Sequence, residues 1–108
     1  MDIIKNTGNY TGKELYKLTK SNSVKRMSDI SEDEVVTLLG YVTYKDEESG
    51  NIITAIDTES GAYATNSKTF YDTLDEIATI MGDEYPIDIK VGHGKSKNGR
   101  DFIYCDLV

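Results

Sequence analysis

The alternation of apolar and polar positions along the chain predicts a mostly β protein. Residues 35–45 are rich in β-branched and aromatic side chains and predict a long strand that is apolar on both faces around Gly40. A glycine in the middle of such a strand indicates a bend, so that one strand serves two parts of a barrel. Four further strands are predicted over residues 52–58, 62–66, 87–91 and 101–107.

Between the third and fourth strands the periodicity changes from that of a strand to that of a helix. The apolar residues that fall on one helical face are Phe70, Leu74, Ile77, Ala78 and Met81. Ser67 or Thr69 can cap the start of this helix, and Gly82 ends it.

The first part of the chain is predicted to be an extension. Residues 1–9 are polar and are expected to be loose. A short helix is predicted from Gly12 to Lys20, with Leu15 and Leu18 on one side. The chain therefore divides into an N-terminal extension, residues 1–33, and one domain, residues 34–108.

The order of elements in that domain is three strands, one helix and two strands. A five-stranded Greek-key barrel with its helix between strands three and four is the oligonucleotide/oligosaccharide-binding (OB) fold. The prediction is thus an OB-fold barrel with a short helical segment before it. A small α+β sandwich has the same order of elements and stays open as an alternative.

Charge is distributed unevenly along the 108 residues. The formal net charge is −7, which by itself argues against a polyanionic ligand. However, residues 1–28 carry +4, residues 29–88 carry −13 and residues 89–108 carry +2, and no acidic residue occurs from Ile89 to Arg100. Within a Debye length of about 8 Å a ligand responds to such local clusters more than to the total.

The segment between the fourth and fifth strands is the leading candidate for phosphate contacts. Residues 92–99 contain three glycines and are expected to form a loop. The candidate basic residues in and beside this loop are Lys90, Lys95, Lys97 and Arg100. The alternative is a plain hairpin turn at Asn98-Gly99, which requires no ligand.

Four aromatic residues of the predicted strands are candidates for stacking on nucleobases: Tyr44, Tyr63, Phe102 and Tyr104. Phe102 and Tyr104 share one face of the last strand, whereas Ile103 and Cys105 share the other. Because a barrel interior favours the aliphatic face, we expect the two rings to point outward. The alternative is that the rings belong to the core.

Several classes of protein are not favoured. The carboxylates occur without an acid/base context, so no catalytic residue is assigned and we do not expect an enzyme. One histidine and one cysteine cannot form a zinc site or an internal disulfide, and no metal or cofactor is expected. No apolar run approaches a membrane span and no signal peptide is recognised, so the expected location is the cytoplasm, or the host cytoplasm for a phage protein.

Two stretches resemble small single-stranded-DNA-binding proteins of phages and mobile elements of Gram-positive bacteria. They are residues 63–70, Tyr-Ala-Thr-Asn-Ser-Lys-Thr-Phe, and residues 94–103, from Gly94 to Ile103. The resemblance covers about residues 30–108 and implies an OB fold and a role in DNA replication or recombination. It departs at the C-terminus, where many such proteins have an acidic tail that recruits partners.

The sequence therefore predicts a sequence-tolerant single-stranded-DNA-binding protein that uses phosphate contacts and base stacking. Replication or recombination proteins and further copies of the chain are the other partners to consider. The alternative is an acidic interaction protein that mimics nucleic acid and inhibits a host nuclease or defence complex. The fifteen acidic residues between 29 and 88 motivate that alternative.

Overall fold

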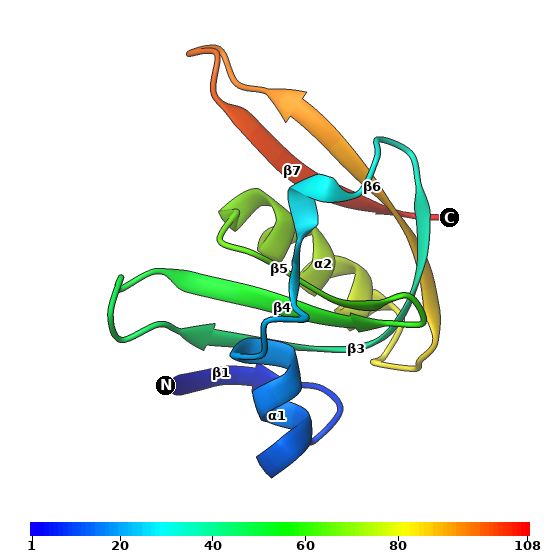
Figure 1. Cartoon of the computed structure of the whole chain (residues 1–108). Coiled ribbons are helices and arrows are strands. Elements are labelled where there is room, and N and C mark those ends of the chain that lie inside the picture. The colour runs from blue at the N-terminus through cyan, green and yellow to red at the C-terminus, as the bar shows by residue number, and fades with distance from the viewer.

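Most of the chain forms β-strands, and two α-helices pack against them. The computed structural model describes residues 1–108 (Figure 1). Its elements in chain order are β1 (Asp2–Asn6), α1 (Gly12–Thr19), β2 (Lys25–Arg26), a 3-10 turn (Met27–Asp29), β3 (Val35–Lys45), β4 (Ile52–Thr58), β5 (Gly61–Thr65), α2 (Lys68–Ile80), β6 (Ile87–Lys95) and β7 (Asp101–Leu107).

The strands form one open, curled sheet in the order β2-β5-β4-β3-β6-β7, and β1 pairs with β3. The meander β3-β4-β5 is antiparallel, as predicted, and β6 returns to lie beside β3. The predicted mostly β architecture is therefore confirmed, and the curled sheet is compatible with a barrel-like fold, but the sheet is open and has seven strands where five were predicted.

The predicted bend in the long strand is confirmed. Residues 35–38 of β3 pair with β6, and its remaining residues pair with β4 after a register shift between Leu38 and Gly40. Leu39 has no partner on β4 at this shift, and this extra residue changes which side chains of β3 lie on the same face of the sheet. Leu38 and Tyr41 would lie on opposite faces of a regular strand, but both enter the main core, whereas Val42 enters a second, smaller one.

The main core lies between the curled sheet and α2. Phe70, Leu74 and Ala78 of α2 are fully buried, as the helical spacing predicted. Ser67 caps the helix by accepting a hydrogen bond from the Phe70 amide at 3.2 Å. The helix is also attached to β7, because the Thr73 hydroxyl accepts a hydrogen bond from the Cys105 amide at 3.1 Å.

The expectation of a loose N-terminus is wrong, because residues 2–6 form β1 along the end of β3. The polar side chains of this segment have specific partners. Lys5 donates to Asp75 of α2 at 3.0 Å and lies over the Tyr41 ring, and the Thr7 hydroxyl accepts from the Tyr41 amide. Long-range polar contacts therefore hold a segment whose own sequence is not strand-like.

The predicted N-terminal helix forms as α1, and it covers the outer face of the meander. Leu18 of α1 is buried in the second core with Val42, Tyr44 and Ala55 of β3 and β4. Neither α1 nor α2 has the length and apolarity that crossing a membrane requires.

The last two strands form a long hairpin that projects from the rest of the sheet (Figure 1). The prediction of a loop over residues 92–99 is wrong for its first half, because β6 continues to Lys95. Gly92 and Gly94 lie opposite Tyr104 and Phe102, and a Cβ atom at either glycine would overlap the facing ring. The rings cover the glycines and supply the packing that these residues lack in a strand.

Candidate nucleic-acid interface

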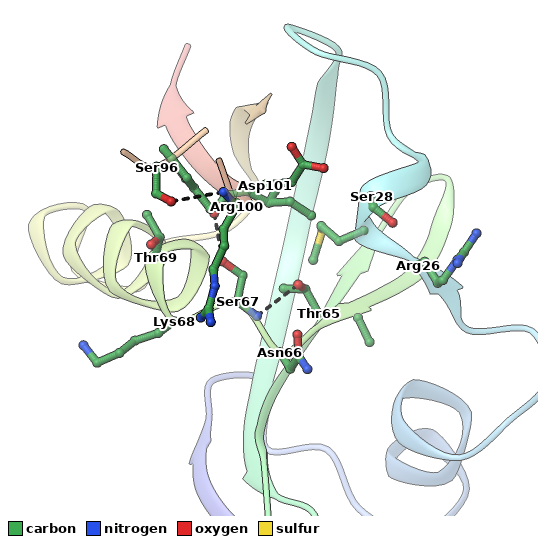
Figure 2. Close-up of a pocket in the computed structure, with 14 residues that line it drawn as sticks. Arg26, Ser28, Thr65, Asn66, Ser67, Lys68, Thr69, Ser96, Arg100 and Asp101 are labelled. Atoms are coloured by element: carbon green, nitrogen blue, oxygen red, sulfur yellow. Dashed lines mark hydrogen bonds between the residues drawn. The ribbon is translucent and has the colours of Figure 1, made fainter. Parts of the chain in front are cut away.

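A cleft of about 610 Å³ opens where the two ends of the curled sheet approach each other (Figure 2). Three segments that are far apart in the sequence line it. They are residues 26–28 from the end of β2 into the 3-10 turn, residues 64–69 from the end of β5 to the first turn of α2, and the hairpin residues Ser96 and 100–103. The cleft therefore brings together the predicted basic hairpin and part of the basic N-terminal segment.

The lining of the cleft is basic although the whole chain is acidic. Its charged side chains are Arg26, Lys68, Arg100 and Asp101, so three cations oppose one carboxylate. Arg26 lies 3.5 Å from Asp29 and Lys68 lies 2.8 Å from Asp72, whereas Arg100 forms no ion pair with any carboxylate of the chain. The positive charge of Arg100 is thus available to a ligand.

The first turn of α2 adds to this positive field. Partial positive charge accumulates at the start of a helix, and the first turn of α2 contains no acidic side chain that would offset it. Figure 2 shows Arg100 extending from the hairpin toward Ser67 and Lys68. The hydrogen bond to Asp72 raises the pKa of the Lys68 ammonium. An anion is the species that this arrangement favours.

Local hydrogen bonds fix the polar floor of the cleft. The Ser67 hydroxyl donates to the Ile103 carbonyl at 3.0 Å, and the Thr65 hydroxyl accepts from the Ser67 amide at 3.1 Å. In the hairpin turn, the Ser96 hydroxyl accepts from the Arg100 amide at 3.2 Å (Figure 2). These bonds join β5, α2 and β7, so the backbone around the cleft is held in place without a ligand.

The other predicted phosphate-binding residues lie outside the cleft. Lys95 points toward Asp101 at 3.8 Å, and Lys97 lies exposed in the hairpin turn. Lys90 is half-buried opposite Asp106, near the other end of the hairpin. Of the four predicted basic residues, only Arg100 lines the cleft.

Two of the predicted stacking rings are presented on the hairpin. Ile103 and Cys105 pack toward the core, so the predicted inward face of β7 is confirmed for these two residues, although Leu107 is 42% exposed. Phe102 and Tyr104 are half-buried on the opposite face, with ring centroids 6.1 Å apart. Phe102 also contributes to the lining of the cleft.

The other two predicted rings are not available for stacking, which corrects the expectation from sequence. Tyr44 is 3% exposed because α1 covers it, and Tyr63 is 8% exposed because β2 pairs alongside it. Lys25 of β2 lies over the Tyr63 ring at 5.1 Å. Both rings belong to the packed interior.

The run Thr65-Asn66-Ser67-Lys68-Thr69 contributes five of the fourteen lining residues and was not among the predicted site residues. In the sequence, this run is recognisable as a stretch of small polar residues between a strand and a helix, with a lysine near its end. His93 lies in β6, with its Nε2 atom 2.7 Å from the Ile30 carbonyl oxygen.

No group of three or more His, Cys, Asp and Glu side chains is placed to hold a metal ion. Burial raises the pKa of the Cys105 thiol to about 11, which makes it a poor nucleophile at neutral pH.

Comparisons of the chain with models of protein families, with curated proteins and with solved structures gave no match.

Proposed function

We propose that this protein binds single-stranded DNA without sequence preference and acts in the replication or recombination of phage or mobile-element DNA. The observation that carries the proposal is the cleft, which Arg26, Lys68 and Arg100 line from three separate segments of an otherwise acidic chain. Phosphates of one strand would follow these cations. The hairpin rings beside the cleft would stack on bases, which is how sequence-tolerant binding is achieved.

The connectivity of the sheet supports an OB fold as the framework of this function. Three hairpin-connected strands, β3, β4 and β5, are followed by α2 and by β6, which lies beside β3. This is the order of a Greek key, and the OB fold is a partly open five-stranded barrel of that kind. In our proposal β1, α1 and β2 are additions to this barrel.

The position of α1 favours the cleft over the face of β4 and β5 as the binding surface. OB folds commonly bind oligonucleotides on the face of their second and third strands, here β4 and β5. In this protein, α1 packs over that face through Leu18. The strand is therefore proposed to pass between β5, the start of α2 and the hairpin.

The test is a titration of fluorescently labelled oligo-dT, followed by anisotropy, alongside a duplex of the same length. We expect clear preference for oligo-dT, because stacking requires unpaired bases and a chain of net charge −7 attracts duplex weakly. Equal affinity for both forms would contradict the proposal, as would the absence of binding.

The acidic mimic of nucleic acid is a second candidate, favoured by the burial of Tyr44 and Tyr63. It accounts for the charge of residues 29–88 but leaves the basic cleft without a role. Failure of oligo-dT to bind at low salt would support this candidate.

Alanine substitution of Phe102 or Tyr104 is expected to weaken oligo-dT binding by about 1–3 kcal/mol for each base that can no longer stack. Both rings are half-buried, so the loss of stability should remain below the roughly 3–5 kcal/mol of a core aromatic. Thermal melting and oligo-dT titration separate the two effects. Tyr16→Ala is the control, since Tyr16 is 59% exposed on α1. A large loss of stability with unchanged binding of the folded fraction would show that the rings serve the hairpin alone.

A further inference from the structure

We propose that the bound strand continues past the start of α2 into a second cleft, where one of its bases stacks on Tyr71. This inference rests on the proposed function and extends it. Tyr71 would be a further stacking residue, and its position would set the direction in which the strand leaves the basic cleft.

The second cleft, of about 460 Å³, adjoins the first. Asn66, Ser67 and Lys68 line both clefts, so in this proposal the two serve as one groove beside the first turn of α2. The other lining residues of the second cleft are Ile4, Asn51, Ile52, Tyr71 and Asp72.

The chemistry of the groove changes along its length. The first cleft holds three cations, whereas the second holds one aromatic and two aliphatic side chains beside Lys68. Ile4 is 52% exposed and Ile52 is 40% exposed, and the Tyr71 side chain on α2 is half-buried. Exposed apolar side chains around an aromatic ring suit a planar, weakly polar group such as a nucleobase.

The shared residues connect the two environments. Lys68 lies where the clefts meet, so a phosphate held there would place the neighbouring nucleotide in the second cleft. The side-chain amides of Asn51 and Asn66 lie along the same cleft and can donate to or accept from the edge of any base. Asp72 pairs with Lys68 at 2.8 Å and can release it to a phosphate.

The chain has no tryptophan, which allows a direct test. Tyr71→Trp keeps an aromatic ring at the position and introduces a single fluorescent reporter. Tyr16→Trp introduces the same reporter on α1, where Tyr16 lines neither cleft. Binding of labelled oligo-dT is measured in parallel by anisotropy for both variants.

We expect oligo-dT to quench tryptophan fluorescence in the Tyr71→Trp variant at the concentrations at which anisotropy reports binding, and to leave the Tyr16→Trp variant unchanged. Oligo-dT binding without quenching at position 71, or with equal quenching at both positions, would overturn the inference and leave the proposed function standing. Absence of binding to the wild-type protein would overturn both.

A second measurement uses affinity. Tyr71→Ala is expected to weaken oligo-dT binding by about 5- to 150-fold, the equivalent of about 1–3 kcal/mol for one stacked base, and Tyr71→Phe to retain binding. Thermal melting confirms that each variant is folded, and Tyr71→Leu replaces Tyr71→Ala if the latter is not. A folded variant without the ring that binds as tightly as wild type would overturn the inference.

Discussion

Replacing Arg26, Lys68 and Arg100 together by alanine is expected to weaken oligo-dT binding by about 100-fold at 0.1 M salt. Each phosphate contact to a single strand contributes about 0.7 to the slope of log affinity against log salt, so three contacts contribute about 2. Between 1 M and 0.1 M salt, that slope corresponds to two powers of ten. The measurement is anisotropy at several salt concentrations, and the lower slope is as diagnostic as the lower affinity.

The matched control removes three cations that do not line the cleft. Lys13, Lys17 and Lys45 are exposed, and their replacement by alanine changes the net charge by the same amount. Similar losses of affinity in both triple variants would mean that binding follows net charge. An unchanged slope in the Arg26/Lys68/Arg100 variant would show that phosphates lie elsewhere.

Leu74→Ala is expected to lower the free energy of unfolding by about 2–5 kcal/mol, because the fully buried Leu74 side chain would leave a cavity between α2 and the sheet. Ile80→Ala is the control, since Ile80 is 75% exposed on the same helix and its loss should cost less than about 0.5 kcal/mol. Denaturant unfolding measures both variants.

The same pair of variants tests whether Leu74 contributes to folding alone or also to oligo-dT binding. Because Leu74 lines neither cleft, the folded fraction of Leu74→Ala should bind oligo-dT as wild type does. A stable Leu74→Ala protein would contradict the assignment of Leu74 to the core. A stable but non-binding one would place it in the site.

Elements that carry their own periodicity were predictable from the sequence. The bounds of β3, β4 and β7 follow the predicted ranges, and α2 begins after Ser67, one of its two predicted caps. In each case the pattern is set by residues close together in the chain, so local spacing is sufficient. The bend at Gly40 was predictable from the glycine in the middle of a long apolar strand.

The hairpin shows where local reasoning fails. Gly92 and Gly94 indicate a loop when β6 is considered alone, but their partners Tyr104 and Phe102 supply the missing packing across the ladder. The aromatic residues were predicted to form a stacking surface without their glycine partners. A cross-strand pair becomes visible only when the register of both strands is known.

Contacts between distant segments decided the remaining differences. Residues 2–6 form β1 through partners on β3 and α2, and α1 covers Tyr44 through contacts that no local pattern specifies. The cleft is a similar case, since its lining comes from three separate segments. The sequence indicated Arg100 as a site residue and showed that residues 1–28 are basic, but not that Arg26 and Arg100 line one cleft with Lys68.

The central claim is that a single strand lies in the basic cleft, and backbone-amide NMR of the labelled protein tests it most directly. On addition of oligo-dT, we expect the amide signals of residues 65–69 and 100–103 to shift most, because these segments line the cleft. Helix α1 lines neither cleft, and its signals should stay unchanged. Shifts confined to α1, with none at residues 65–69, would contradict the account.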